Sequence, residues 1–197
     1  KIEQAKNMQI VNCWVCELPN SIELIGGENI VVKNCQLGAQ PTGITCKVQE
    51  VNKLSFINNQ VYPDGRENLV LDACNNCVIE GNNFKSYYNG ILVLNGNDNT
   101  VNKNIFWLTG AVQNQLLDHG DDFGIINVKG NNNMVTSNSL SCEWAYAGAV
   151  TVNAVQGTGN VFKNCFVDNL ESYRVFLVNA QTEVSNCVSS DKVSIVE

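Results

Sequence analysis

The tetrapeptide Phe162-Lys163-Asn164-Cys165 is one of eight related segments in which a short run of strand-forming character ends in asparagine. The other seven are Ile10–Cys13, Val32–Cys35, Phe56–Asn59, Glu80–Asn83, Asn102–Ile105, Thr136–Ser139 and Val184–Cys187. The third-position asparagines, from Asn12 to Asn186, are 22, 24, 24, 22, 34, 26 and 22 residues apart. A repeat of this length over the whole chain predicts a solenoid whose turns stack on a shared core.

The composition predicts that each turn of this solenoid is built from strands. Asparagine is as abundant as all charged residues together, with 31 of each, and there are three prolines. Asparagine is a poor helix former that suits turns. Leucine-rich repeats have a similar period, but their Leu-x-x-Leu-x-Leu pattern is missing. We therefore expect one all-β domain over residues 1–197, a parallel β-helix of about eight coils.

The repeated asparagine has a mechanical role in such a fold. Each coil must bend sharply between two strands, and asparagine tolerates the left-handed backbone that a bend needs. Stacked over successive coils, the side-chain amides can bond to one another as an Asn ladder. The residues that follow the asparagines then form a column of mostly small side chains, namely Cys13, Cys35, Asn59, Asn83, Ile105, Ser139, Cys165 and Cys187.

The charge balance disfavours a nucleic-acid partner. Lys and Arg number 12 against 19 Asp and Glu, so the net charge is −7, and the only arginines are Arg66 and Arg174. No basic face is therefore available for phosphates. No apolar run reaches the length of a membrane span and no signal-peptide pattern is present, so no membrane partner is expected. The chain begins at Lys1, and both a cytoplasmic and a secreted location in a bacterium stay open.

The nine cysteines form no compact metal-binding pattern. Cys13 and Cys16 make one C-x-x-C pair and Cys74 and Cys77 another, but their separation far exceeds that of a zinc module. We expect buried thiols that act as small hydrophobic side chains. With one histidine and no Gly-rich phosphate loop, we expect no metal and no cofactor, apart from a minor alternative of calcium at the aspartates of the insertion described below.

A second strand in each coil carries an apolar column that we expect to face outward. Its seven members are Glu23, Thr45, Val70, Leu92, Ile126, Thr151 and Phe176. Four of them are large and apolar, whereas a sheet face in contact with water would alternate with polar residues. The predicted interface of a cyclic homo-oligomer is therefore formed by Val70, Leu92, Ile126 and Phe176; scattered surface apolar residues are the alternative.

One interval exceeds the usual period by about ten residues, which predicts an inserted loop over residues 107–122. Insertions in a solenoid lie on one side of it, and loops carry function. This one holds the candidate substrate-binding residues Trp107, Asp118, His119, Asp121 and Asp122, which include the only histidine. A solvated acidic loop is the structural alternative.

Candidate chemistry comes from two carboxylates in the first coil. β-Helices commonly act on polysaccharides, as in the pectin lyase-like fold, but the arginine and histidine motifs of pectin lyases and polygalacturonases are missing here. Acid–base glycosyl transfer needs only carboxylates. Glu17 lies on an expected turn and Glu23 on the outer face of the following strand, where a neighbouring subunit could exclude water from it. An ordinary surface glutamate is the alternative.

From about Val11 to Asn164 the chain resembles the inulin fructotransferases, a family that includes the difructose-anhydride hydrolases. The resemblance lies in "VNCWVCELPNSIEL", "NNFKSYYNGILVL", "LLDHGDDFGIINVKGNNNMVTSN" and "GTGNVFKN", in order and at matching intervals. It implies a right-handed parallel β-helix, assembled as a homotrimer with active sites between subunits. It also implies a fructan or oligosaccharide substrate, whose β-fructosyl linkage is split by attack of a neighbouring hydroxyl, which forms an anhydride.

Carried over by position, the resemblance places the catalytic glutamate at Glu23, where it protonates the leaving oxygen and then assists the attacking hydroxyl. The catalytic aspartate falls at Asn12, whose amide cannot take a proton, so we expect the standard reaction to be impaired. The family's chains are also longer at the N-terminus, and their equivalent of the 107–122 loop is longer than the one here.

Three hypotheses therefore stay open. The first is a fructosyltransferase or a glycoside hydrolase on fructans that uses Glu23, with Glu17 or the Asp118–Asp122 loop as the second carboxylate. The second is a glycan-binding or structural β-helix that has lost its chemistry at Asn12. The third is a pure assembly module, such as a segment of a trimeric spike.

Overall fold

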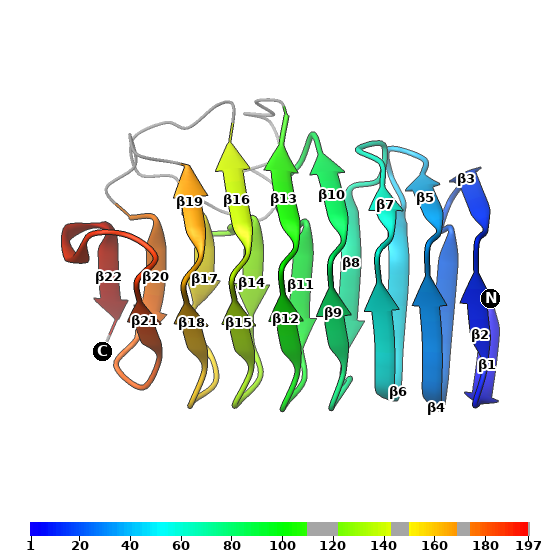
Figure 1. Cartoon of the computed structure of the whole chain (residues 1–197), viewed down its shortest axis with the longest axis horizontal. Helices are drawn as coiled ribbons and strands as arrows, with labels where there is room; N and C mark the ends of the chain where they lie inside the picture. Colours follow the sequence, from blue (N-terminus) through cyan, green and yellow to red (C-terminus); the bar gives the residue numbers. More distant parts are fainter. Residues whose placement is uncertain (110–121, 143–149, 169–173, 197) are drawn as a thin grey trace.

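The computed structural model describes residues 1–109, 122–142, 150–168 and 174–196. These residues form a parallel β-helix whose turns lie side by side from the N-terminal to the C-terminal end (Figure 1). All strand pairs between turns are parallel, as between β10 (Asn83–Ser86) and β13 (Ile105–Leu108). The predicted all-β solenoid is therefore confirmed, with about seven complete turns between the eight asparagine segments.

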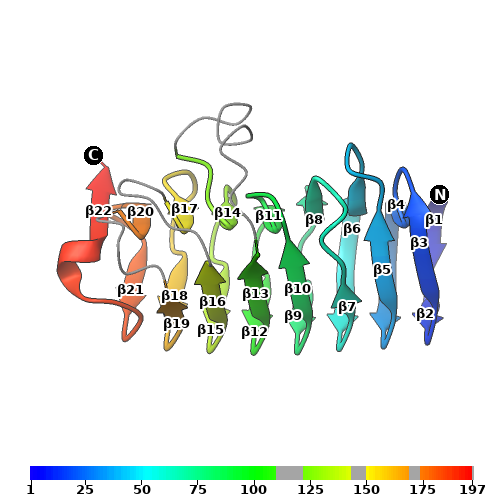
Figure 2. The ribbon, with the colours of Figure 1, turned by 90° about the horizontal axis from the view of Figure 1, so that it is seen from above.

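Each turn has three sides, which we call first, second and third in chain order (Figure 2). The first side holds β1 (Ile2–Lys6), β8 (Glu67–Asp72), β11 (Leu92–Asn95), β14 (Ile126–Val128), β17 (Val152–Ala154), β20 (Phe176–Asn179) and β22 (Val193–Val196). The second side holds β2 (Gln9–Val11), β9 (Val78–Glu80), β12 (Thr100–Asn102), β15 (Met134–Thr136), β18 (Val161–Lys163) and β21 (Glu183–Ser185). Two long strands, β4 (Ile22–Lys33) and β6 (Ile44–Ile57), bend and run along both of these sides.

The third side is a separate seven-stranded sheet. Its strands are β3 (Trp14–Leu18), β5 (Gln36–Ala39), β7 (Gln60–Val61), β10, β13, β16 (Ser139–Cys142) and β19 (Phe166–Asp168). The single 3-10 helix of the described residues, η1 (Ser190–Lys192), precedes β22. None of the helical structure in the described part of the chain is long and apolar enough to cross a membrane.

The core is a stack of equivalent side chains inside the coil. On the third side, Phe84 and Phe106 from neighbouring strands stack with ring centroids 5.0 Å apart and planes 2° from parallel. Phe56 on the second side adds a further ring at 6.0 Å from Phe84. All three rings are at most 1 % exposed, so the apolar contacts that stabilise one turn are made with the turns before and after it.

At the corner between the second and third sides, one residue makes the bend and the next residue points into the core. The sequence repeat had suggested that a single asparagine makes the bend and forms the ladder. The residue with a left-handed backbone is asparagine in five turns, as at Asn34 (φ 55°) and Asn164 (φ 55°). In the three middle turns it is Gly81, Lys103 and Ser137, with φ between 54° and 67°. The prediction that an asparagine makes every bend is therefore wrong by one residue in these turns.

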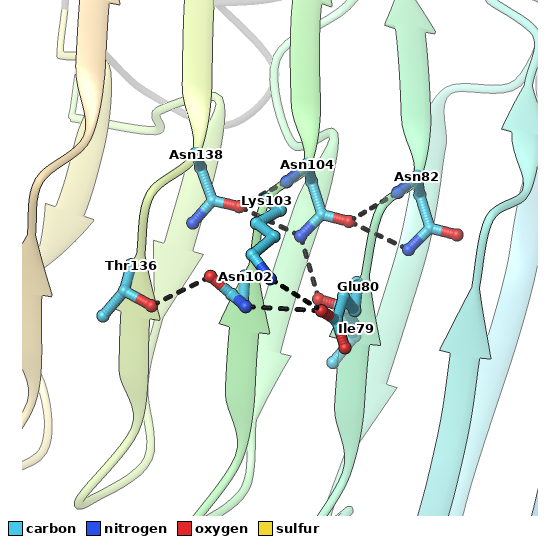
Figure 3. Close-up of polar contacts among 8 residues, drawn as sticks. All are labelled: Ile79, Glu80, Asn82, Asn102, Lys103, Asn104, Thr136 and Asn138. Carbon is cyan, nitrogen blue, oxygen red and sulfur yellow. Dashed lines mark hydrogen bonds and ion pairs between the residues drawn. The ribbon is translucent and has the colours of Figure 1, made fainter.

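The asparagines of the middle turns occupy the next position and form the predicted ladder (Figure 3). Asn104 Oδ1 accepts from the backbone N and from Nδ2 of Asn82, both at 2.9 Å. Asn104 Nδ2 donates to the Ile79 carbonyl at 2.9 Å and to Asn138 Oδ1 at 3.0 Å. Asn59 starts this ladder by donating to Asn82. The column continues at its two ends with cysteine, so its members are Cys13, Cys35, Asn59, Asn82, Asn104, Asn138, Cys165 and Cys187.

The corner between the first and second sides follows the same construction, which the sequence reasoning missed. Left-handed residues such as Asp98 (φ 57°) and Asn132 (φ 54°) precede a second buried ladder. There Asn99 Nδ2 donates to Asn133 Oδ1 at 2.9 Å, and Asn133 Nδ2 donates to Asn160 Oδ1 at 3.1 Å. Both corners therefore place a left-handed residue directly before a buried residue whose amide bonds to the next turn.

Substituting a buried ladder amide should destabilise the protein more than substituting an exposed one. Asn104→Ala leaves the buried Asn82 backbone N–H without its acceptor, and an unsatisfied buried group costs about 1–3 kcal/mol. With the loss of packing, we expect about 3 kcal/mol in the free energy of unfolding, measured by urea titration.

Asn97→Ala is the matched control for this prediction. Asn97 Oδ1 accepts from Asn131 at 2.9 and 3.1 Å, but this pair is exposed and water can replace the lost bonds. We expect a loss below about 1 kcal/mol. Equal losses in the two variants would contradict a structural role for the buried ladder.

Candidate functional site

The outer face of the first side carries two adjoining hollows, which together we call the first-side groove. The first hollow is lined by Lys47, Gln49, Val70, Asp72, Val93, Asn95 and Lys129. The second is lined by Asp122, Phe123, Asn127, Lys129, Asn153 and Gln156. Both share Lys129, and their other strand residues come from successive turns, so the groove runs along the axis of the solenoid.

The floor of the first hollow is apolar. Val70 and Val93 are register partners on neighbouring strands, and both are half-buried with side chains on the outer face. Their neighbours in the same strands, Leu71 and Leu94, point inward and are fully buried. Side chains alternate between the two faces from Leu69 to Asp72 and along β11. The two half-buried valines therefore lie side by side on the outer face, on strands about 4.8 Å apart.

A carboxylate held by two amides lies beside this floor. Asp72 Oδ1 accepts from Asn95 Nδ2 at 2.7 Å, and Asp72 Oδ2 accepts from Gln49 Nε2 at 3.4 Å. Lys47 and Lys129 line the same hollow. The arrangement offers hydrogen-bond donors and acceptors above an apolar patch, which are the elements that hold a polar ligand with an apolar ring face.

The second hollow is closed by the chain that follows the insertion. Gly124 donates its backbone N–H to Asn127 Oδ1 at 2.9 Å and accepts from Asn127 Nδ2 at 2.8 Å. Asn153 Nδ2 donates to the Asp122 carbonyl at 2.7 Å. Asp122 Oδ1 also pairs with Arg174 Nη1 at 2.9 Å. The segment 122–124 is therefore fixed across the outer face and buries Asn127 to 3 % exposure.

The predicted interface column is wrong for three of its four residues. Leu92, Ile126 and Phe176 are 0 % exposed and belong to the core, so they cannot meet a neighbouring subunit. Only Val70 faces outward. The strand register pairs Leu92 with Leu69 and not with Val70, one residue from the alignment that the sequence suggested. The expected alignment of Leu92 with Ile126 is found, but both side chains point inward. The outward column consists of Glu23, Lys47, Val70, Val93, Asn127, Asn153 and Leu177.

The three predicted catalytic residues lie on different parts of the coil. Glu23 is half-buried on the first side, where its register partner is Lys47 of the groove. Asn12 is the exposed left-handed residue (φ 56°) between the second and third sides. Glu17 is exposed near the end of β3 on the third side, and its carbonyl accepts from Gln40 Nε2 at 3.2 Å. Within one chain, the structure does not bring these residues together.

The predicted substrate-binding residues of the insertion are separated in the same way. Trp107 lies on the third side, where Lys85 Nζ is 4.5 Å from its ring centroid. Asp122 lies at the first-side groove. Asp118, His119 and Asp121 fall outside the described residues. The insertion therefore starts after a third-side strand and ends at the groove.

The cysteines lie in the stacked columns of the coil. The two members of the second C-x-x-C pair, Cys74 and Cys77, are at most 1 % exposed. Burial raises the pKa of Cys74 to about 12 and that of Cys77 to about 11, which keeps both thiols protonated. Among the residues that the structure describes, no group of three or more His, Cys, Asp and Glu side chains is placed to hold a metal ion.

Sequence reasoning missed Asp72 and its partners Gln49 and Asn95. These three residues are 23 residues apart in sequence and meet only because neighbouring turns are stacked in register. A signal did exist, since each is the polar residue two positions after an outward-facing side chain of the first side. This pattern can be recognised only when the strand register is known.

These features define a parallel β-helix protein with a groove along one outer face. A family model described as periplasmic copper-binding protein (NosD) matches residues 3–186. Because the match spans nearly the whole chain, this protein belongs to that family. No curated protein sequence matches the chain.

Solved structures of DFA-IIIase from Arthrobacter chlorophenolicus A6 have the same fold. The structure without its lid in complex with GF2 has a TM-score of 0.85 at 24 % identity and covers 99 % of this chain and 51 % of its own. The complex with GF2 gives 0.83 at 21 % identity over 99 % and 51 %. The complex with DFA-III gives 0.73 at 19 % identity over 99 % and 55 %. This chain therefore spans about half the length of those structures and shares their fold.

The family description names copper, and the described residues do not fit a copper centre. Copper sites in proteins use sets of thiolate, thioether and imidazole ligands. The thiols lie along stacked columns, and no third ligand joins any two of them in the described part of the chain.

The strand register makes a prediction about two adjacent residues of β11. Leu92→Ala removes a fully buried side chain, for which the loss is about 2–5 kcal/mol. Val93→Ala removes a half-buried side chain of the groove floor, and we expect less than about 1 kcal/mol in the free energy of unfolding. A larger loss for Val93→Ala than for Leu92→Ala would show that the register is shifted by one residue.

Proposed function

We propose that this protein binds an oligosaccharide along the first-side groove. The observation that carries the proposal is the valine floor beside a carboxylate that two amides hold in place. A sugar ring has an apolar face, which suits Val70 and Val93, and a rim of hydroxyls, which suits Asp72 and its neighbours. The lysines at the groove edge supply further donors.

The groove geometry also suits an extended ligand. Strands in a sheet are about 4.8 Å apart, so equivalent side chains repeat along the axis at that spacing. Polar groups line it from Gln49 through Lys129 to Gln156. We propose a fructan oligosaccharide as the ligand class, which is supported by the sequence resemblance to fructotransferases and by the shared fold of DFA-IIIase, whose structures contain GF2 or DFA-III.

A second candidate function is β-fructosyl transfer or hydrolysis, which Glu23 favours. Glu23 lies one turn before the groove, next to Lys47, so a sugar in the groove can reach it. Its role would be general acid. Asn12, at the position of the family's catalytic aspartate, supplies no second carboxylate.

Asp72, the carboxylate of the groove nearest to Glu23, cannot serve as the second catalytic carboxylate beside Glu23 of the same chain. Asp72 is two turns from Glu23, which is about 10 Å along the axis before the offset along the strand is added. Retaining glycosidases need about 5 Å and inverting ones about 6.5–9.5 Å. Asp72 therefore does not act with Glu23 in one chain, and a second carboxylate would have to come from elsewhere, such as a neighbouring chain in the proposed homotrimer. Binding is the better supported function.

The binding proposal is tested by titration calorimetry with the trisaccharide GF2, inulin and DFA-III. Asp72→Asn removes the charge that accepts hydroxyl hydrogen bonds, and we expect affinity to fall by about tenfold or more, since a bond to a charged group contributes about 1.5–3 kcal/mol. Asp168→Asn, an exposed carboxylate on the third side, should leave affinity unchanged. Binding of none of these sugars, or equal affinity in both variants, would contradict the proposal.

Product analysis with the same sugars separates binding from catalysis. Turnover by the wild type that is lost in Glu23→Gln would establish the second candidate function, and binding without turnover would exclude it. Asn12→Asp is the matched gain-of-function variant, because aspartate also tolerates the left-handed backbone at this position. The native mass, measured by light scattering, tests the homotrimer.

A further inference from the structure

Two cysteine pairs occupy the ends of the column that contains the first asparagine ladder. Cys13 and Cys35 lie at the N-terminal end, and Cys165 and Cys187 lie at the C-terminal end. In each pair the inner cysteine is buried, at 1 % for Cys35 and 3 % for Cys165. The outer cysteine of each pair is half-buried. Neither pair belongs to the groove.

The C-terminal pair has the geometry of a crosslink. Cys165 and Cys187 follow β18 and β21, which pair in register up to Lys163 and Ser185. The Cys165 backbone N–H donates to Cys187 Sγ at 3.4 Å. Positions equivalent in neighbouring strands are about 4.8 Å apart, within the range of 4.4–6.8 Å between Cα atoms that a disulfide needs.

The asparagines that directly precede the two cysteines keep the corners of these two turns aligned. Asn186 Nδ2 donates to Asn164 Oδ1 at 3.3 Å, so the left-handed residues before the two cysteines are also stacked. Cys187 is only partly buried. A small reagent therefore has access to Cys187, and Cys165 lies directly behind it.

The two thiols of this pair differ from the other buried thiols because a hydrogen bond between them shifts both of their pKa values. A hydrogen bond from the Cys187 thiol lowers the pKa of Cys165, and the same bond raises the pKa of Cys187. Burial raises the pKa of Cys35 in the other pair. Cys187 is the partly buried thiol that a reagent meets first, and Cys165 is the buried thiol beside it.

We propose that Cys165 and Cys187 are a modification site at which a disulfide joins the last two turns of the solenoid. A low-molecular-mass disulfide such as oxidised glutathione is the oxidant. Cys187 first loses its proton and attacks one sulfur of this oxidant. This step forms a mixed disulfide on Cys187 and releases one glutathione as a thiol. Cys165 then loses its proton to solvent, attacks the Cys187 sulfur as a thiolate and releases the second glutathione as a thiolate.

The crosslink would fix the turn that contains β21 to the turn that contains β18. In the reduced chain, the turn that contains β21 is held on this corner by backbone bonds and by one exposed amide pair. A covalent bond at the column position fixes this turn to its inner neighbour, in the place where an asparagine pair does so in the middle turns. We expect β21 to become more resistant to local opening.

The test is thiol trapping on the full chain. The native protein is incubated with oxidised glutathione at pH 8, blocked with N-ethylmaleimide in denaturant and analysed by mass and peptide mapping. We expect the number of alkylated thiols to fall from nine to seven, with a Cys165–Cys187 crosslink. Cys187→Ser should abolish the crosslink, and Cys13→Ser, the matched change at the opposite end, should leave it intact.

Two results would overturn the proposal. One is a stable glutathione adduct on Cys187 without the Cys165 crosslink, since it would place Cys165 out of reach. The other is a set of disulfides in which Cys165 and Cys187 are no more frequent than the remaining cysteines. The circular dichroism spectrum of each variant is compared with that of the wild type, so that loss of the crosslink is not a loss of fold.

Discussion

A buried asparagine amide that bonds to the turns on both sides of it is the interaction on which this structure depends. At every corner the backbone turns away from the sheet ladder, which leaves buried N–H and C=O groups that must find partners. Asn104 satisfies them by accepting two N–H bonds from Asn82 and donating to the Ile79 carbonyl. Because each amide also bonds to the next one, the corners of neighbouring turns are fixed in the same register.

This fixed register determines where side chains of the outer faces meet. Residues far apart in sequence become neighbours when their turns are stacked, as Gln49, Asp72 and Asn95 are. The groove is therefore a consequence of the corners, because a shift of one residue at a corner would turn Val70 and Val93 inward. It would also separate Asp72 from its amide partners.

The sequence predicted the fold class because the asparagine period is visible without alignment. It did not predict the register, because one amino acid serves two adjacent positions. Asparagine makes the bend at Asn34 and Asn164, while Gly81, Lys103 and Ser137 make it elsewhere and leave asparagine to the ladder. The first-side strands gave no help, since both Ile125 and Ile126 are buried and the run has no clear period of two.

The candidate site was less accessible to sequence reasoning than the fold. Glu23 was identified on an outward position, and the structure places it one turn from the groove. The expected pairing with Asn12 or Glu17 does not occur within a chain, since sequence spacing does not say on which side of a coil a residue lies. The resemblance to fructotransferases supports the proposed substrate class, and Asp72 is found only through the register.

The most direct measurement of the central claim is amide hydrogen exchange by NMR at the ladder corners. The backbone N–H groups of Asn59 and Asn82 donate to buried side-chain oxygens at 2.8 and 2.9 Å. They should exchange only through global unfolding, with the slowest rates in the protein. The N–H of Thr158, which donates to the exposed Asn131 Oδ1 at 2.9 Å, should exchange much faster. Exchange of Asn59 and Asn82 at the rate of Thr158 would contradict the ladder as the interaction that holds the turns together.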